Sequence, residues 1–220
     1  MKNIKAIIFD AYGTLFDVNS AAEKSKSKIG DKWESFANYW RKTQLEYTWL
    51  RSLMGRHKDF WQITEDSLDK SMRAFNIDAS MKNELLDLYK ILSPYPEVKE
   101  TLKKLKEKKY KLAILSNGTP ALLNELVKSN DLQNLFDDIF SIEEVKIYKP
   151  SSKVYDMPIK KYNIKKEDTA FLSANTWDVS GGGNYGFRSI WVNRNNNIFD
   201  NLDYIAKNEI SGLNQLLDIL

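Results

Sequence analysis

Polar residues that could carry out chemistry lie at the ends of three apolar runs and at the start of one predicted helix. They are Asp10, Ser116-Asn117-Gly118, Lys149-Pro150 and the segment from Ser173 to Asp178. A carboxylate such as Asp10 can attack a substrate covalently when its geometry is imposed on it. Each segment alone also fits a turn, a helix cap or a solvated side chain. Their order and spacing together predict a single catalytic site.

A parallel α/β sheet would bring these segments together. Short apolar runs predict strands at 4–10, 111–116, 138–142, 169–173 and 188–192. Helical patterns lie between them, near 97–109, 120–129 and 151–162, and at the C-terminus. This alternation predicts a Rossmann-like sheet with helices on both faces. Such sheets bind ligands at the carboxyl ends of their strands, where the polar segments lie.

Between residues 17 and 92 the chain changes character, because only helical patterns occur there. Aromatic residues recur at helical spacing in its first part, at Trp33, Phe36, Trp40 and Tyr47. Further helices are predicted at 59–76 and 81–91, and Ser93-Pro94-Tyr95-Pro96 then breaks the pattern. The block follows the first strand, so it predicts an inserted helical cap. We expect a core of residues 1–15 and 96–220 and a cap of residues 16–95, with linkers near 14–17 and 92–97.

The composition excludes several classes of function. Charged residues make up 29% of the chain and its net charge is +3, which indicates a mixed surface and not a nucleic-acid footprint. The absence of cysteine excludes thiol nucleophiles, and the single histidine, His57, excludes histidine triads. No apolar run approaches the roughly 20 residues of a membrane span, and the N-terminus lacks a long apolar targeting region. We expect a cytoplasmic protein with no membrane or nucleic-acid partner.

The segment Asp10-Ala11-Tyr12-Gly13-Thr14 resembles the first motif of the haloacid dehalogenase superfamily. Most members transfer phosphoryl groups and carry a second Asp two residues after the nucleophile, which protonates the leaving oxygen. Tyr12 stands at that position here. A halide is already a stable anion and needs no proton, so the resemblance implies carbon–halogen chemistry. Ala174 stands where the phosphatases usually place a magnesium-binding carboxylate, which implies catalysis without a metal or other cofactor.

Further segments narrow the resemblance to the L-2-haloacid dehalogenases. They are Arg41 to Met54, Lys146 to Tyr155, Ser173 to Asp178 and Trp191 to Arg194. The resemblance covers nearly the whole chain. It implies hydrolysis of short-chain L-2-haloalkanoic acids to D-2-hydroxy acids with inversion, through an ester on Asp10. The partners that it implies are the small 2-haloacid, the halide and a second copy of the chain in a homodimer.

Under this mechanism, each polar site residue has a role. Asp10 is the nucleophile and Thr14 positions it, while Lys149 keeps it ionised and offsets the charge of the substrate carboxylate. Asp178 would orient the water that hydrolyses the ester. Three more residues would support these groups, namely Ser173 and Asn175 beside the water and Tyr155 within the Lys149–Asp178 network.

Substrate recognition would involve both the core and the cap. The substrate carboxylate would be bound by Ser116, Lys149 and the backbone N–H groups of Ala11 and Tyr12. Arg41, assisted by Asn117, would receive the halide, because a weakly hydrated guanidinium suits a soft anion. An apolar wall would be formed by Tyr12, Leu45, Phe60 and Trp177. These four side chains also fit ordinary core packing.

Other functions of the same scaffold stay open. A magnesium-dependent phosphatase would need a general acid after Asp10 and a metal site, and a non-catalytic binding domain would show a degraded site. A fluoroacetate-specific dehalogenase would need more donors around fluoride than the single His57 offers. The chain departs from the family at Lys42, where Gln is usual, and at Gly181-Gly182-Gly183. The three glycines should loosen their helix by roughly 1 kcal/mol each relative to Ala.

Overall fold

The centre of the molecule is a six-stranded sheet in which each strand is parallel to its neighbours. The computed structural model describes residues 3–220, and the strand order is β3-β2-β1-β4-β5-β6. The strands are β1 (Ala6–Phe9), β2 (Lys111–Ser116), β3 (Asp138–Ser141), β4 (Thr169–Ser173), β5 (Arg188–Val192) and β6 (Asn208–Ile210). The predicted parallel α/β sheet is confirmed. Residues 1–2, at the expected start of the core, lie outside the described residues.

The central strands β1, β2 and β4 are mostly apolar and, apart from Lys111, fully buried, because both faces of the sheet are covered. All four residues of β1 are buried, and Phe9 pairs with Ile114 of β2 on one side and Leu172 of β4 on the other. This register makes the three strands end at one edge, so the residues that follow them emerge close together. The edge strand β6 was not predicted. It is three residues long and only Ile210 is buried, so it gives no apolar run in the sequence.

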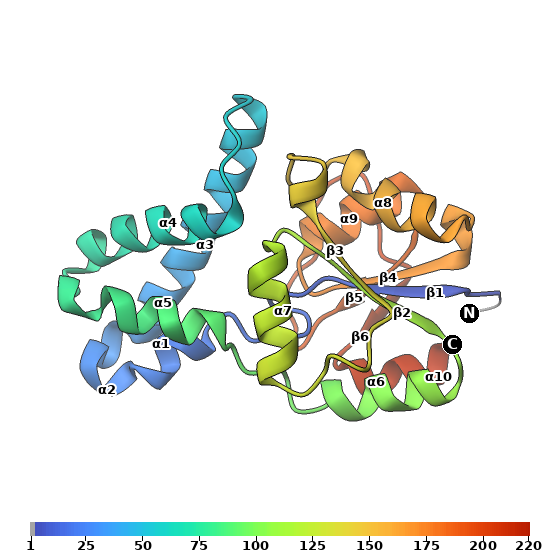
Figure 1. Cartoon of the computed structure of the whole chain (residues 1–220), viewed down its shortest axis with the longest axis horizontal. Helices are drawn as coiled ribbons and strands as arrows, with labels where there is room; N and C mark the ends of the chain where they lie inside the picture. The colour runs from blue at the N-terminus through green and yellow to red at the C-terminus, as the bar shows by residue number, and fades with distance from the viewer. Residues whose placement is uncertain (1–2) are drawn as a thin grey trace.

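The core helices lie on both sides of the sheet, with α8 and α9 on one side and α6 and α10 on the other (Figure 1). Their bounds are α6 (Val98–Glu107), α7 (Pro120–Ser129), α8 (Ser152–Tyr162), α9 (Thr176–Tyr185) and α10 (Leu216–Ile219). The start of α7 follows from its sequence, because Thr119 accepts a hydrogen bond from the backbone N–H of Leu122 and Pro120 occupies the first helical position. The C-terminal helix is a single turn, preceded by a 3₁₀ turn at Leu213–Gln215.

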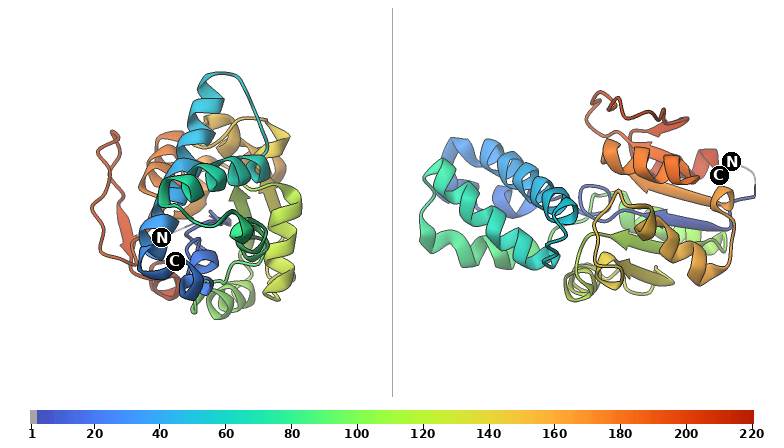
Figure 2. Two further views of the ribbon diagram at one scale, coloured as in Figure 1. Left: turned by 90° about the vertical axis from the view of Figure 1, so that its left-hand side faces the viewer. Right: turned by 90° about the horizontal axis from the view of Figure 1, so that it is seen from above.

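A separate helical lobe is formed between β1 and β2 in the sequence and lies beyond the carboxyl ends of the strands (Figures 1 and 2). It contains α1 (Ser20–Lys24), α2 (Lys26–Ile29), α3 (Trp33–Leu53), α4 (Phe60–Phe75) and α5 (Lys82–Lys90). The aromatic spacing in α3 places Phe36 and Trp40 on its buried face. Among residues 3–220, every helix is too short or too polar to span a membrane.

Two connections join the lobes, and they run antiparallel beside each other. Phe16 and Pro94 form an isolated antiparallel bridge. On either side of it, the backbone N–H of Asp17 donates to Ser93 O (2.9 Å) and that of Tyr95 donates to Leu15 O (3.0 Å). The connections therefore form one short ribbon.

A second contact between the lobes lies near the end of α3. The hydroxyl of Tyr148 in the core donates to Lys58 O (2.6 Å), and the backbone N–H of Tyr148 donates to Ser52 Oγ (3.2 Å). His57 Nε2 lies 3.1 Å from Glu143 Oε2. The helical lobe is therefore attached to the core both at the ribbon and at this distal point.

Candidate active site

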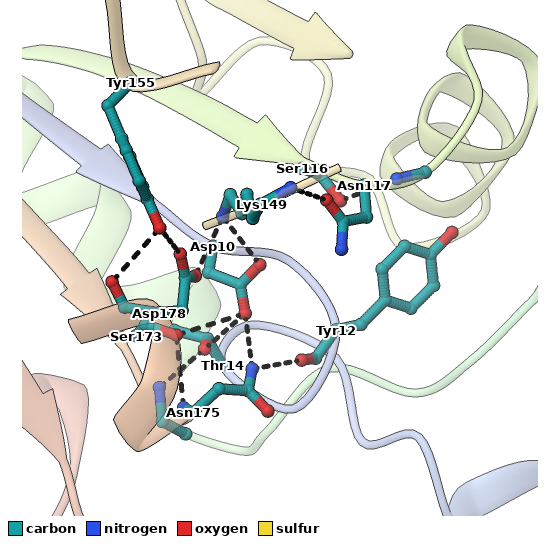
Figure 3. A network of polar contacts seen from close by, with 12 residues as sticks. Asp10, Tyr12, Thr14, Ser116, Asn117, Lys149, Tyr155, Ser173, Asn175 and Asp178 are labelled. Atoms are coloured by element: carbon teal, nitrogen blue, oxygen red, sulfur yellow. Dashed lines mark hydrogen bonds and ion pairs between the residues drawn. The ribbon is translucent and has the colours of Figure 1, made fainter. Parts of the chain in front are cut away.

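Asp10 directly follows β1 and is almost completely buried, with 5% of its surface exposed. Its Oδ2 atom accepts hydrogen bonds from Thr14 Oγ1 (3.0 Å), Asn175 Nδ2 (2.9 Å) and Ser173 Oγ (3.4 Å). Its Oδ1 atom lies 3.1 Å from Lys149 Nζ. Figure 3 shows the carboxylate held between these groups. One oxygen is thus fixed by three donors, while the other faces the ammonium group.

Lys149 lies between two carboxylates. Its Nζ is 3.1 Å from Asp10 Oδ1 and 2.9 Å from Asp178 Oδ2, and the side chain is fully buried (Figure 3). Burial alone would lower the pKa of Lys149, but the charges of Asp10 and Asp178 outweigh it and raise the pKa. The ammonium therefore stays charged and supports both carboxylates.

Asp178 lies in the first turn of α9 and is completely buried. Burial raises the pKa of Asp178 above its usual range, and the charge of Lys149 opposes this effect. The Tyr155 hydroxyl donates to Asp178 Oδ1 (2.8 Å). The carboxylate is thus stabilised enough to ionise, yet it keeps a higher proton affinity than a solvated Asp.

The glycines of α9 allow Tyr155 to reach Asp178. A side chain at Gly181 would collide with the Tyr155 hydroxyl and with Pro150, and one at Gly182 would come within 2.6 Å of the Phe171 ring. The helix α9 runs unbroken from Thr176 to Tyr185, and the loosening that its glycines predict stays a prediction. Close packing explains the glycines. The sequence pattern does not reveal this packing, because its partners Tyr155, Pro150 and Phe171 are distant in the sequence.

The loops after β1 and β4 are bonded to each other around Asp10. Thr14 Oγ1 accepts from the backbone N–H of Ala174 (2.8 Å), and Asn175 Nδ2 donates to Tyr12 O (3.2 Å). Ser173 Oγ accepts from the backbone N–H of Asn175 (3.1 Å). The structure therefore gathers Thr14, Ser173 and Asn175 around Asp10. The sequence predicts this contact for Thr14, whereas the predicted place of Ser173 and Asn175 beside a water stays a prediction.

Ser116 and Asn117 lie on the other side of Lys149. Ser116 Oγ accepts from the backbone N–H of Gly118 (3.1 Å), which leaves its proton free for another acceptor. Asn117 Oδ1 accepts from the backbone N–H of Lys149 (3.1 Å). Its amide nitrogen consequently points toward the space between Asp10 and Tyr12 (Figure 3). Both residues can donate to an anion placed there.

The helical lobe contributes Arg41 from α3. Arg41 Nη2 donates to Tyr12 O (3.3 Å) and its Nη1 donates to Gln44 Oε1 (2.9 Å). The guanidinium therefore lies against the loop that carries Asp10. Sequence analysis missed Gln44, although a Gln on the buried face of α3, four residues after Trp40, is an available signal.

The structure brings together only part of the predicted apolar wall. The Tyr12 ring packs against Phe60 with a centroid distance of 5.0 Å and against Tyr89 at 5.8 Å. Trp177 instead packs edge-to-face on Trp49 of α3, at 5.4 Å, and lines an adjoining hollow of about 570 Å³. Leu45 is half-buried on α3, and Lys42, one turn earlier, is exposed. Tyr12 and Phe60 thus meet as predicted, while the roles of Leu45 and Trp177 stay predictions.

Metal ligands are sparse around Asp10. Among residues 3–220, no group of three or more His, Cys, Asp or Glu side chains is placed to hold a metal ion. Asp10 and Asp178 are the two carboxylates of the site, and the Lys149 ammonium contacts both. Ala174 adds no oxygen ligand beyond its backbone carbonyl, which accepts from Trp191 Nε1 (3.3 Å). The donor set is thus poor for a hard cation such as Mg²⁺.

Comparison with known proteins assigns this fold and site to a class. The family model for haloacid dehalogenase-like hydrolases matches residues 4–186. The chain therefore belongs to the haloacid dehalogenase-like hydrolases.

Relatives within this class narrow the assignment. The chain is 39% identical to (S)-2-haloacid dehalogenase 1 of Pseudomonas sp. (strain CBS-3), with 100% of this chain and 98% of that protein covered. A solved dehalogenase structure matches with a TM-score of 0.98 and 36% identity, over 100% of this chain and 98% of the other. The L-2-haloacid dehalogenase from Xanthobacter autotrophicus, solved with chloropropionic acid covalently bound, matches with a TM-score of 0.91 and 30% identity over 98% of both chains. Within its class, the chain groups with the (S)-2-haloacid dehalogenases.

Proposed function

We propose that this hydrolase converts short-chain L-2-haloalkanoic acids to D-2-hydroxy acids, with inversion at C2 and an ester intermediate on Asp10. The observation that carries the proposal is the buried Asp10 carboxylate, which pairs with Lys149 and has Tyr12 where a phosphatase needs an acid. The covalently bound chloropropionic acid of the Xanthobacter relative supports the same chemistry.

In the first step, an Asp10 oxygen attacks C2 from the side opposite the halogen. The new C–O bond forms as the C–halogen bond breaks, and the halide leaves with the bonding electrons. Oδ1 is the better candidate for the attacking atom, because Oδ2 is occupied by three donors. The halide needs no proton, so the apolar ring of Tyr12 does not impede its departure.

In the second step, water attacks the carbonyl carbon of the Asp10 ester. Asp178 takes a proton from this water, the ester C–O bond breaks, and the product oxygen receives the proton. The raised pKa of Asp178 makes it a stronger base than a solvated Asp, and Lys149 and Tyr155 hold it in place. Ser173 and Asn175 stabilise the charge that develops on Asp10.

The substrate carboxylate is proposed to lie near Ser116, Lys149 and the backbone N–H groups of Ala11 and Tyr12. The buried ammonium compensates the repulsion between this carboxylate and Asp10. Arg41 and the free amide nitrogen of Asn117 would then face the halide. Leu45, Phe60 and Trp177, with Tyr12, would exclude water from the reacting carbon.

We also propose that residues 16–95 act as a cap over a core of residues 1–15 and 96–220. The chain is proposed to work as a homodimer in the cytoplasm. Leu53 and Met54 at the end of α3 are 85% and 63% exposed, which gives the cap an apolar end that a second copy could cover. The absence of cysteine fits a reducing compartment. Sedimentation of the wild type and of Leu53→Glu would test the dimer, which this substitution should dissociate.

The deciding experiment is halide release from L- and D-2-chloropropionate in the presence of EDTA. Release from the L form alone, lost in Asp10→Asn, is the expected result. Single turnover in ¹⁸O-labelled water should place the label on Asp10 and not on the product, because the product oxygen comes from the carboxylate. Magnesium-dependent hydrolysis of a phosphate ester without halide release would overturn the proposal in favour of a phosphatase. Inactivity toward both would favour a binding domain.

A further inference from the structure

Arg194 follows β5 and lies far from Asp10 in the sequence, yet it contacts the loop that carries Asp10. Arg194 Nη2 donates to Thr14 O (2.9 Å) and Nη1 lies 3.5 Å from Gly13 O. Its side chain is only 14% exposed. Arg194 has no role in the proposed dehalogenation steps.

The same guanidinium also holds the second connection between the lobes. Arg194 Nε and Nη2 donate to Glu97 Oε1 at 3.1 and 2.7 Å, and its guanidinium carbon lies 3.8 Å from the centre of the Tyr95 ring. Glu97 Oε1 also accepts from the backbone N–H of Leu213 (3.3 Å). Arg194 therefore joins both connections to the core at the base of the ribbon formed by residues 15–17 and 93–95.

Arg194 itself is held in a fixed position. Its neighbour Asn193 donates to Glu209 Oε1 (2.6 Å), and the Asn193 backbone N–H donates to Ile210 O (2.8 Å). The end of β5 is thus tied to β6. Burial raises the pKa of Glu97, but the hydrogen bonds from Arg194 outweigh it and lower the pKa, so the pair is charged. A charged guanidinium that is held in place and carries several N–H donors can bind two backbone segments at once.

We propose that Arg194 is a positioning residue that sets the geometry of the nucleophile through Thr14 and fixes the hinge of the cap. The link is short, because the carbonyl of Thr14 accepts from Arg194 while its hydroxyl donates to Asp10 Oδ2 (3.0 Å). A shift of Thr14 therefore turns the Asp10 carboxylate away from its line of attack. This inference rests on the proposed dehalogenation.

The test is Arg194→Lys, which keeps the charge but cannot reach Thr14, Gly13 and Glu97 at once. Single-turnover halide release from L-2-chloropropionate should slow by roughly 10- to 100-fold, since small misplacements of a reacting group have effects of this size. KM should change by less than about threefold, because the groups proposed to bind substrate are intact. The matched control is Arg51→Lys in the cap, which perturbs another partly buried ion pair (Arg51 Nη2 to Asp66 Oδ2, 2.8 Å) and should leave the rate unchanged.

Two further measurements separate positioning from stability. Addition of guanidinium ion at non-denaturing concentration should restore part of the rate of Arg194→Ala and should have no effect on Arg51→Ala. Exchange of the backbone N–H groups of residues 13–17, Tyr95 and Glu97 should speed up in Arg194→Lys, and this readout does not depend on activity.

The outcomes distinguish failure of this inference from failure of the proposed function. A lower melting temperature in Arg194→Lys, with an unchanged single-turnover rate per folded molecule, would overturn the positioning role alone. If Arg194→Lys does not fold, a lack of guanidinium rescue in Arg194→Ala would overturn it. Absence of halide release from the wild type would overturn the proposed function and, with it, this inference.

Discussion

The two halves of the candidate site are held in different ways. In the core half, Asp10, Lys149, Asp178 and Tyr155 are buried, and each charged group contacts at least one partner at 2.8–3.1 Å. In the helical half, the Arg41 guanidinium contacts one backbone carbonyl of the core, at 3.3 Å. The difference indicates a division of labour. Under the proposed mechanism, the core fixes the reacting charges before substrate arrives, and the helical lobe adds Arg41, a group that can adjust to the halide.

The largest expected effect is in the core half, in Lys149→Met. Loss of the ammonium leaves two buried carboxylates without their shared partner, so the free energy of unfolding should fall by about 3 kcal/mol. Halide release should slow by about 10³-fold or more, because substrate then meets an uncompensated charge. Chemical unfolding and single-turnover kinetics would measure the two effects. Lys160→Met, which breaks an exposed ion pair with Asp156, is the matched control and should change neither. Equal effects in both variants would refute the special role of Lys149.

The helical half should tolerate change better, as Arg41→Lys would show. Lysine keeps the charge but cannot bond Gln44 and Tyr12 together, so we expect halide release to slow by about 10²-fold. Hydrolysis of the preformed ester should keep its rate, since Asp178 is untouched. Rapid-quench measurement of halide and hydroxy acid would separate the steps. Lys42→Gln, one residue along the same helix, restores the family's usual residue and should change affinity for anions more than rate. A slowed second step in Arg41→Lys would contradict the halide role.

A smaller effect on the rate is expected for Gln44, the residue of the helical lobe that holds Arg41 in place. Gln44 is buried, and its amide nitrogen donates to Thr64 Oγ1 (2.7 Å) and to the Tyr89 hydroxyl (3.0 Å). In Gln44→Leu these groups lose a partner, so stability should fall by about 1–3 kcal/mol. The rate should fall by only about tenfold, because Arg41 keeps its bond to Tyr12. Thr48→Val, whose hydroxyl bonds within α3, is the control. A rate loss larger than that of Arg41→Lys would show that Gln44 does more than orient Arg41.

The sequence predicts contacts that follow from the sheet topology better than contacts that depend on how helices and loops pack. Asp10 follows β1, and Ser116 and Ser173 are the last residues of β2 and β4. Parallel strands end at one edge of the sheet, so the meeting of these residues follows from topology alone. The contacts of Gln44 and Arg194 depend on how helices and loops cross, which the sequence pattern does not encode. Arg194 belongs to a segment that resembles the family, but nothing in the sequence pairs it with Glu97, which lies 97 residues away. The sequence pattern also does not show why α9 contains glycines, because their close contacts are with Tyr155 and Phe171, which are distant in the sequence.

The finest test of the comparison concerns a single hydrogen bond in the core half. Tyr155 donates to ionised Asp178 and thereby favours its charged form, against the burial that raises the pKa of Asp178. In the proposed mechanism, ester hydrolysis needs the ionised Asp178 carboxylate, so the rate of hydrolysis should rise with pH through this raised pKa. In Tyr155→Phe the hydrogen-bond donor is lost, so the pKa of Asp178 should rise further. The acid limb of the pH–rate profile for ester hydrolysis should therefore move to higher pH. A hydrogen bond of about 1 kcal/mol corresponds to about 0.7 pH unit.

The control for this shift is Tyr185→Phe, which removes a similar bond to Asp156 (2.6 Å) on the outer side of the core and should leave the pH profile unchanged. Stability depends on pH in the opposite direction to the rate, but Tyr155→Phe should shift both profiles to higher pH. Folded Asp178 binds its proton more tightly than the unfolded chain does, so its contribution to stability decreases as pH rises toward the folded pKa. Tyr155→Phe should extend this decrease to higher pH in unfolding curves. An acid limb that stays in place, or moves to lower pH, would mean that Asp178 is not the group whose ionisation controls ester hydrolysis.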